Sequence, residues 1–345
     1  MATPPLAHPA VDGGLIRSRR LEPGDRVALV APSGPIDAER LRAGCAILRS
    51  WGLEPVVGAH VLDADPRLGY LAGTDKDRAA DFQRAWLDPS IAAVLCARGG
   101  YGAQRVADLL DWAALRAAPP KVLIGFSDVT ALHELVAQRL GLVSLYGPMG
   151  AATSFVEDGP TAEHLRRTLF EPATVLTLTG PEAGPLISGR ARGVTAGGCA
   201  SVLAAECGTP GARRSFAGTL LLLEDVNEHP YQLDRILSQL IRSGALAGVR
   251  GVVLGSWYGC GRPERIRDVM AARLAPLGVP VLWELGFGHC PSTLTVPLGV
   301  PALLDADAGT LTLDRPALAD GTGAAEPAPE ALATEPSPVD SFPVD

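Results

Sequence analysis

The sequence predicts an α/β protein: an N-terminal, Rossmann-like domain built on a parallel sheet, followed by a second, smaller α+β domain. Three observations lead to this prediction. The chain has 345 residues, more than one typical core accommodates. Short apolar runs alternate with amphipathic stretches from about residue 25 to residue 140, and strands separated by helices indicate a parallel sheet. A variable stretch that contains Pro and Gly, from about 150 to 185, then interrupts the alternation.

The first half of the chain changes repeatedly from strand-like to helix-like patterning. Apolar runs of four to six residues read as buried strands, and apolar residues that recur at helical spacing read as helices. Gly52 is expected to close the first helix, as glycine commonly does. The expected strands are 25–33, 54–60, 91–100 and the run that starts at Lys121, and the expected helices are 37–52, 75–88, 102–112 and the segment after Ser127.

The second half is expected to contain fewer strand–helix units and a terminal ribbon. The alternating "GTLTLD", preceded by an Asp-Ala-Gly turn, predicts a β-hairpin at its end. The other expected strands are 218–226, 251–257 and 280–289, the expected helices are 230–246 and 263–278, and the ribbon covers 291–314.

The composition divides the chain into five parts. The ends are rich in Pro, Ala and Gly, and the C-terminal end is also acidic, so both are expected to be disordered. The predicted parts are a disordered arm (1–22), the N-terminal domain (23–165), a linker (166–186), the C-terminal domain (187–316) and a disordered tail (317–345).

Charge and cysteine usage argue against several classes of protein. The net charge is −8 and no cluster of Lys and Arg stands out, so nucleic acid is not an expected partner. No apolar run approaches the length of a membrane helix, and the N-terminus lacks the pattern of a secretory signal, so the cytoplasm is the expected compartment. The six cysteines include no C-x-x-C pair, which argues against a zinc site and a disulfide framework.

Ser127 stands where an apolar strand turns into a helix, in the stretch "KVLIGFSDVTALH". One interpretation is a helix N-cap, because a Ser hydroxyl commonly accepts a hydrogen bond from a free backbone N–H at a helix start. The other is a nucleophile elbow, for which Gly125 supplies the room that a tight turn needs. Val129 replaces the second Gly of G-x-S-x-G, so the motif is partial. The stretch by itself leaves both interpretations open.

A serine nucleophile needs a base and an acid that orients it. His289 directly follows an apolar strand and lies among Gly and Pro residues, which suits an exposed general base, although a structural role in the turn fits equally well. Glu224 ends an unusually apolar strand, where a carboxylate needs a partner. A capping role for the helix near Pro230 is the alternative for the Glu224-Asp225 pair. The other histidines have less suitable contexts; they are His8, His60, His133, His164 and His229.

Seven motifs make a resemblance specific. In this order the chain resembles the LD-carboxypeptidases, a family of serine peptidases, from roughly Asp25 to Leu313, through "RGGYGAQRVADLLDW", "IGFSDVTALH", "YGPM", "AGGCASVLAAECGTP", "LLLEDVNEHPYQLDRILSQL", "VVLGSWYGC" and "GFGHCPSTLTVPLG". The resemblance implies a nucleophile at Ser127, an acid at Glu224 and a base at His289. It also implies an oxyanion hole from the backbone N–H groups of Gly100 and Asp128, an acyl-enzyme, and no metal or cofactor.

The resemblance further implies a substrate and an assembly. The substrate would be a murein tetrapeptide from which the terminal D-Ala is released during cell-wall recycling, and the enzyme would be a homodimer. Two departures put the substrate in doubt: the family commonly has Asn-Leu where this chain has Cys199-Ala200, and His where it has Tyr146. Candidate substrate-binding residues are Arg98, Tyr101, Trp257 and Tyr258.

Three alternatives compete with this prediction. Within the family, a self-immunity hydrolase would cleave an acyl-nucleotide toxin and stack its base on Trp257 or Tyr258, although Trp257 fits a core position better. A non-catalytic nucleotide-binding module is a second alternative, but "GYGAQR" lacks the third Gly of a dinucleotide motif. A cysteine nucleophile is the third. Cys96 lies in a buried run, where a thiol is inert, whereas Cys199 in its Gly-rich turn is harder to dismiss.

Overall fold

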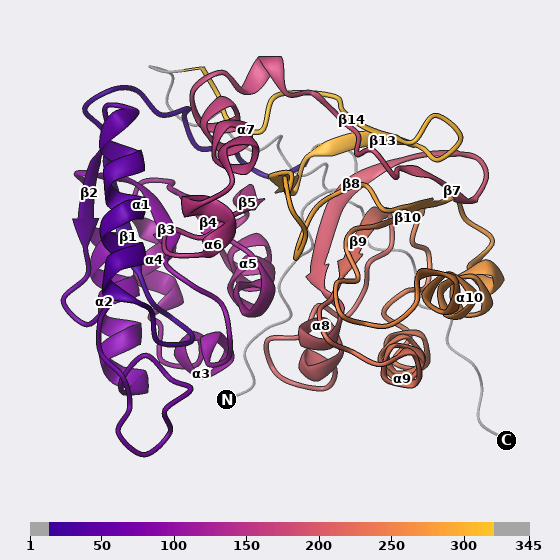
Figure 1. Cartoon of the computed structure of the whole chain (residues 1–345), viewed down its shortest axis with the longest axis horizontal. Coiled ribbons are helices and arrows are strands. Elements are labelled where there is room, and N and C mark those ends of the chain that lie inside the picture. Colours follow the sequence, from indigo (N-terminus) through magenta and orange to yellow (C-terminus); the bar gives the residue numbers. More distant parts are fainter. Residues whose placement is uncertain (1–13, 321–345) are drawn as a thin grey trace, which may run out of the picture.

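The computed structural model describes residues 14–320 of the chain. Within them two sheets stand side by side, and the chain completes most of the left-hand sheet of Figure 1 before it builds the right-hand one. The predicted fold class, a parallel α/β domain followed by a second mixed domain, is confirmed.

The first sheet has the strand order β12-β5-β4-β3-β1-β2. Its first five strands in the sequence run parallel, and β12 is added antiparallel to β5. Strands β3 and β4 are buried almost throughout, which explains the continuous apolar runs that predicted them. The strands are β1 (Arg26–Val30), β2 (Glu54–Val57), β3 (Ile91–Cys96), β4 (Val122–Gly125), β5 (Ser144–Tyr146) and β12 (Val296–Leu298).

Helices connect these strands. The first helix shows why the local sequence worked as a predictor: the Asp37 carboxylate accepts from the N–H groups of Glu39 and Arg40, and Gly52 follows the helix with a φ of +81°. The helices are α1 (Ala38–Ser50), α2 (Asp75–Leu87), α3 (Ala103–Ala107), α4 (Trp112–Ala117), α5 (Thr130–Leu135), α6 (Thr153–Val156) and α7 (Gly159–Phe170), with a π-helical turn at Val136–Leu140 and 3₁₀ turns at Ser127–Val129 and Pro172–Thr174.

The second sheet is mixed, with the order β6-β14-β13-β8-β9-β10-β11-β7. Its central strands β8 to β11 run parallel, and the outer strands run antiparallel. Strands β13 and β14 form the predicted hairpin. The strands are β6 (Thr177–Leu178), β7 (Gly184–Ile187), β8 (Arg190–Cys199), β9 (Thr219–Glu224), β10 (Gly251–Leu254), β11 (Val281–Trp283), β13 (Pro301–Asp305) and β14 (Thr310–Leu313), and the helices are α8 (Ala200–Glu206), α9 (Pro230–Arg242) and α10 (Pro263–Leu274), followed by a 3₁₀ turn at Ala275–Leu277.

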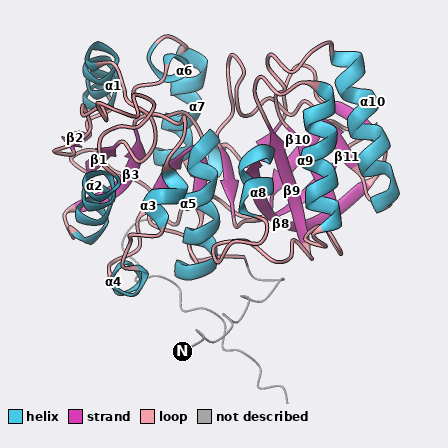
Figure 2. Cartoon of the chain, turned by 90° about the horizontal axis from the view of Figure 1, so that it is seen from below, coloured by secondary structure: helices cyan, strands magenta, loops and turns pink. Residues whose placement is uncertain are grey.

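The two sheets share a junction. Helices α5 and α8 lie side by side between them, as Figure 2 shows. The chain also crosses the junction directly, because β12 pairs in the first sheet and β13, which follows at once, pairs in the second. One apolar core contains Phe126 from the first sheet and Phe287 from the second. The junction is therefore a packed interface.

The predicted linker is wrong for most of its length. Residues 166–170 complete α7, and β6 and most of β7 lie at opposite edges of the second sheet. Pro185 pairs with Leu282 on an edge strand, a place that tolerates proline. The Pro and Gly residues of this stretch thus mark sheet edges.

Both predicted disordered ends are wrong where the structure describes them. Leu21 is fully buried, and so, to about 1% exposure, are Ala317 and Leu318. Arg19 and Ala319 form an isolated β-bridge, so the first and last segments of the described residues pair with each other. The remainder of the predicted arm and tail, residues 1–13 and 321–345, lies outside the described residues. No helix within 14–320 has the length and apolarity needed to cross a membrane.

Candidate active site

Ser127 lies at the corner between β4 and α5, as predicted. Its backbone has a φ of +62°, a conformation that few residues other than Gly adopt. A Cβ added to Gly125 would lie 3.1 Å from side-chain carbons of Cys96 and Val129, so the turn is crowded there. Phe126, and not Ser127, occupies the N-cap position of the 3₁₀ turn, and no side chain caps it. The N-cap interpretation is wrong, and the corner has the strained shape of a nucleophile elbow.

His289, in the segment after β11, forms a close pair with Glu224 at the end of β9. The ring Nδ1 of His289 lies 2.7 Å from Glu224 Oε2, and the His289 backbone N–H donates to the same oxygen at 3.2 Å. Glu224 is fully buried, so its charge requires this partner. Burial lowers the pKa of His289, but the hydrogen bond to Glu224 and its charge outweigh burial, and the pKa is raised overall. With Nδ1–H donating to Glu224, Nε2 is left to accept a proton.

The two halves of the site meet at Phe126 and His289, whose ring centroids lie 4.8 Å apart. The residue before Ser127 therefore contacts the candidate base directly. Within residues 14–320 the Ser127 hydroxyl makes no hydrogen bond to the His289 ring. Catalytic hydrogen bonds are often long in an enzyme without substrate and shorten when substrate binds.

Tyr146, one of the two departures from the family pattern, lies between Ser127 and Glu224, and the sequence did not predict these contacts. Its phenol oxygen lies 3.0 Å from the Ser127 backbone nitrogen and 2.5 Å from Glu224 Oε1. Tyr146 is 1% exposed, and burial, followed by the charge of Glu224, raises its pKa well above the usual value. The phenol therefore stays protonated and donates a hydrogen bond to Glu224, while it accepts a hydrogen bond from the Ser127 N–H. The sequence signal for this residue was only its departure from the common His.

The predicted oxyanion donors lie at the same corner as Ser127. A Cβ added to Gly99 would lie 3.1 Å from Ser127 Cβ and 3.3 Å from its Oγ, so the 98–102 loop touches the serine. Gly100 comes next with a φ of +115°. Among the described residues, the Gly100 N–H makes no hydrogen bond to another group. An N–H group without a partner in the loop that touches the serine is consistent with the predicted oxyanion hole.

The Asp128 side chain has a structural role. Its carboxylate accepts from the Ser33 hydroxyl at 2.6 Å and from the Ala103 N–H at 2.8 Å. These bonds connect the start of α3 to the corner that carries Ser127. The Asp128 carboxylate therefore shapes the corner, and Glu224 is the carboxylate that pairs with His289.

The four predicted substrate-binding residues differ in exposure. Arg98 is exposed and donates to the Pro35 carbonyl at 2.7 Å. Tyr101 is 45% exposed, and Tyr258 is 65% exposed. Trp257 is 6% exposed and belongs to the apolar core of the second sheet, which fits the core alternative for this residue. Three of the four are therefore accessible to a ligand.

The alternative cysteine nucleophiles are in unsuitable surroundings. Burial raises the pKa of Cys199 well above the usual value, and the nearby charges of Glu224 and Asp225 raise it further. Burial also raises the pKa of Cys96 strongly. A nucleophilic cysteine needs the opposite environment, one that stabilises the thiolate. Among the described residues no cluster of His, Cys, Asp and Glu has the arrangement of a metal site.

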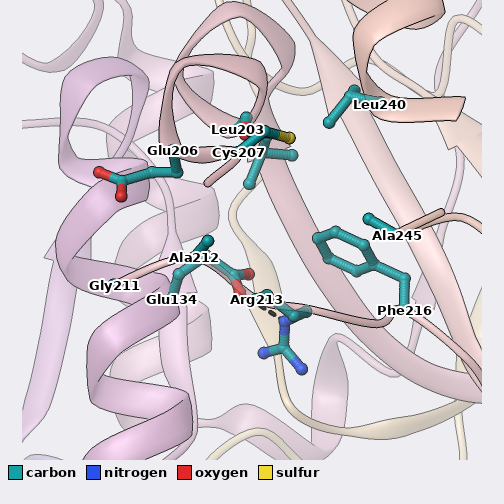
Figure 3. Close-up of a pocket in the computed structure, with 10 residues that line it drawn as sticks. All are labelled: Glu134, Leu203, Glu206, Cys207, Gly211, Ala212, Arg213, Phe216, Leu240 and Ala245. Carbon is teal, nitrogen blue, oxygen red and sulfur yellow. Dashed lines mark hydrogen bonds and ion pairs between the residues drawn. The ribbon is translucent and has the colours of Figure 1, made fainter. Parts of the chain in front are cut away.

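A separate pocket lies at the junction of the sheets (Figure 3). None of the candidate active-site residues lines it. Glu134 of α5 and Arg213 of the second domain form an ion pair within it. The pocket is lined by Glu134, Leu203, Glu206, Cys207, Gly211, Ala212, Arg213, Phe216, Leu240 and Ala245. The pocket therefore lies between the two domains. Its ion pair connects α5, the helix after Ser127, to the segment between α8 and β9.

Comparison with known families supports the division of the site between two domains. A model of the LD-carboxypeptidase N-terminal domain matches residues 27–147, and a model of the LD-carboxypeptidase C-terminal domain matches residues 192–304. The chain belongs to the LD-carboxypeptidase family. It is therefore an enzyme, a serine-type carboxypeptidase, and the alternative of a non-catalytic nucleotide-binding module is set aside. Ser127 lies in the first matched range, and Glu224 and His289 lie in the second.

Several relatives match this chain over most of their own length. A protein of Streptomyces coelicolor named as a carboxypeptidase is 62% identical over 304 residues, which cover 88% of this chain and 98% of that protein. The murein tetrapeptide carboxypeptidase of Pseudomonas aeruginosa is 33% identical over 289 residues, 81% of this chain and 93% of that protein. The microcin C7 self-immunity protein MccF of Escherichia coli is 26% identical over 319 residues, 82% of this chain and 91% of that protein.

The structure of MccF in complex with glutamyl sulfamoyl guanosine has the same fold. It superposes with a TM-score of 0.76 at 24% identity and covers 88% of this chain and 100% of that chain. Both LD-carboxypeptidase domains are therefore arranged here as in a solved relative.

Proposed function

We propose that this LD-carboxypeptidase releases the terminal D-Ala from murein tetrapeptides, using Ser127 as nucleophile, His289 as base and Glu224 as the acid that orients the base. The observation that carries the proposal is the buried Glu224–His289 pair, which lies across the domain junction from a serine held at positive φ. A neutral His beside a buried carboxylate can take the proton of a serine hydroxyl. The name of the Pseudomonas relative supports the murein tetrapeptide as substrate.

The proposed reaction has two halves. His289 Nε2 accepts the Ser127 proton as Oγ attacks the carbonyl carbon that precedes D-Ala. The N–H groups of Gly100 and Asp128 stabilise the oxyanion, the C–N bond breaks, and His289 gives its proton to the leaving amine. Water then attacks the ester with His289 as base, and Ser127 is regenerated. The protein supplies the nucleophile, the base and the oxyanion donors, so the proposal requires no metal or cofactor.

A second candidate is hydrolysis of an acyl-nucleotide toxin, since MccF is a relative. This activity requires an aromatic ring for the base. The burial of Trp257 among apolar side chains disfavours that residue, while the exposed ring of Tyr258 leaves this candidate open. The tetrapeptide is the better-supported substrate, because the relative named for it is the more similar of the two.

The two candidates are separated by direct assay. The purified enzyme is incubated with L-Ala-γ-D-Glu-meso-diaminopimelyl-D-Ala, and release of D-Ala is measured. The matched substrate ends in L-Ala, and a third incubation contains glutamyl sulfamoyl guanosine. We expect release of the terminal Ala only from the first peptide, unchanged by EDTA, with the L-Ala peptide and the nucleotide left intact. Hydrolysis of the nucleotide without D-Ala release would favour the second candidate, and activity lost to EDTA and restored by Zn²⁺ would contradict the serine mechanism.

The cytoplasmic location and the homodimer are part of the same proposal. Both follow from the resemblance to the LD-carboxypeptidases. Light scattering of the purified protein tests the homodimer, and cell fractionation tests the compartment.

A further inference from the structure

Tyr146 stands where the resemblance to the LD-carboxypeptidases leads us to expect His. It ends β5, directly beside Gly125 on the neighbouring strand β4. Because Gly125 lies two residues before Ser127, the register of these two strands brings the Tyr146 side chain to the nucleophile corner. A hydroxyl at the far end of a Tyr ring also reaches further than a His ring at the same position.

The hydroxyl of Tyr146 connects groups from both domains. It accepts from the Ser127 N–H at 3.0 Å and donates to Glu224 Oε1 at 2.5 Å. The other Glu224 oxygen accepts from the His289 ring at 2.7 Å. Each oxygen of the buried carboxylate therefore has one side-chain donor, and the two donors come from different sheets.

The Tyr146 ring is held by its neighbours. Its centroid lies 6.0 Å from those of Phe126 and Phe287, in edge-to-face arrangements. On the third side, a Cβ added to Gly198 would lie 2.9 Å from Tyr146 Cε2, so only Gly leaves room for the ring. The next residue, Cys199, pairs in register with Glu224. Both departures from the family pattern thus lie next to the Glu224 carboxylate: Tyr146 is hydrogen-bonded to it, and Cys199 is its neighbour on the adjacent strand.

We propose that Tyr146 is a positioning residue. Its hydroxyl holds the Glu224 carboxylate toward His289 and fixes the tight turn of the backbone at Ser127. The triad is therefore assembled when the two sheets pack together. This inference rests on the proposed function, in which Glu224 and His289 activate Ser127. It adds a fourth member to the site and explains how groups on two sheets are aligned. A phenol that only filled space would leave the charge on Glu224, and hence His289, unchanged.

The test is Tyr146→Phe, which removes the hydroxyl and keeps the ring. Without this donor, the Glu224 charge is neutralised by His289 alone, so His289 holds its proton more tightly. We expect kcat/KM at pH 7 to fall about tenfold or more and the rise of kcat/KM with pH to move up by about one unit, the effect of one lost hydrogen bond to a buried charge.

Other titratable groups face the Glu224–His289 pair, and they are the same in both enzymes. The pKa of Asp225 is raised to about 6, mainly by burial, so it titrates in the measured range, whereas the pKa values of the neighbouring thiols are all raised. The difference between the two profiles therefore reports Tyr146. These groups are Cys199 at the end of β8, Asp225 after β9, Cys260 after β10 and Cys290 beside His289.

The matched control is Tyr231→Phe on α9, a residue that is 67% exposed and outside the site. It should leave both the rate and the pH profile unchanged. A Tyr146→Phe profile that superposes on the wild-type profile, with D-Ala release intact in the wild type, would overturn the inference and leave the proposed function standing.

A second measurement does not depend on the substrate. The pKa of His289, followed by NMR of the ring carbons in wild type and Tyr146→Phe, should be higher in the variant by about one unit. An equal pKa in the two proteins overturns the inference even if the wild type releases no D-Ala. Should the variant not fold, a high-resolution crystal structure of the wild type decides: Tyr146 Oη must contact both Ser127 N and Glu224 Oε1, and a hydroxyl turned away from either atom contradicts the proposal.

Discussion

At the scale of single residues, the charge that activates Ser127 in the proposed mechanism comes from the opposite sheet. Glu224 is fully buried at the end of β9, and Ser127 is held at positive φ after β4. Each feature costs free energy on its own, a buried carboxylate through lost hydration and a strained turn through its backbone. In the proposed mechanism both features serve the activation of Ser127, through His289 and Tyr146.

The first prediction concerns the proposed triad. Ser127→Ala and His289→Ala should each lower kcat by at least about a thousandfold, because triad members act as a unit. Steady-state D-Ala release measures this, with Ser50→Ala on the exposed end of α1 as the control. If Ser127→Ala retains more than about a tenth of the wild-type rate, a loss of only about 1.4 kcal/mol in transition-state stabilisation, Ser127 is not the nucleophile.

The second prediction concerns pH. The base must be neutral, and the pKa of His289 is raised, so kcat/KM should rise with pH around a midpoint above about 6.5, the usual value for His. The same shift stabilises the fold below the unfolded pKa of about 6.5, and this contribution is lost as pH rises through the folded value. Comparing the pH–rate profiles of the wild type and Asp225→Asn separates the titration of the Asp225 carboxyl from that of His289. A midpoint below about 6 in both enzymes would contradict the assignment of His289.

The places of Ser127, Glu224 and His289 at the ends of apolar runs could be predicted from the sequence, whereas the contacts of Tyr146 could not. Ser127, Glu224 and His289 each follow an apolar run, and the motif series assigned their roles. Tyr146 binds groups 19 and 78 positions away, and no local pattern reports such contacts. The same limit applies to Arg98 and Trp257, whose surroundings come from distant parts of the chain.

At the scale of elements, the most periodic segments were predicted best. Helices α1, α2 and α9 and the strands β3, β4 and β9 lie within the expected ranges. The expected helix 102–112 is divided, because α3 ends at Ala107 and α4 begins at Trp112 with Asp111 as its cap. Strand β8 was missed: its Gly197 and Gly198 have φ values of +124° and +147°, and glycines are poor strand signals.

The third prediction concerns the pair that ties α5 to the second domain. Arg213 and Glu134 are 16% and 5% exposed, so removing one partner leaves a buried charge. Arg213→Met should lower the free energy of unfolding by about 2–4 kcal/mol, measured by urea denaturation. Adding Glu134→Leu should recover much of the loss, because the unpaired charge is then removed.

The control for this prediction is an exposed pair. Arg42 and Glu39 are 70% and 86% exposed, and Arg42→Met should change stability by less than about 0.5 kcal/mol. Equal effects of Arg213→Met and Arg42→Met would show that the junction pair does not hold the domains together.

At the scale of the whole molecule, the two domains share one apolar core, and one strand of the C-terminal part of the chain joins the first sheet. Strand β12 belongs to the first sheet although the chain around it belongs to the second. The length of the chain predicted two domains, but the sequence could not predict this crossing, because Val296–Leu298 reads as one more apolar run. The ends were misjudged for a related reason: Ala317 and Leu318 pack into the first domain, far from their neighbours in sequence.

The fourth prediction follows from these packed ends. A chain that stops at Pro316 loses the buried Ala317 and Leu318 and the bridge between Arg19 and Ala319. Its thermal midpoint should fall by about 3–6 °C relative to a chain that stops at Asp320. Differential scanning calorimetry of the two truncations measures the difference, and equal midpoints would show that these contacts contribute nothing.

Whether Ser127 is activated from the other domain can be measured by labelling with a fluorophosphonate, which reacts with activated serine hydroxyls, followed by peptide mass spectrometry. If the site assembles from both domains as proposed, the wild type is modified at Ser127, and His289→Ala and Glu224→Gln, both in the second domain, are modified at least about a hundredfold more slowly. Modification at another residue, or labelling of Ser127 at an unchanged rate in both variants, would contradict the account.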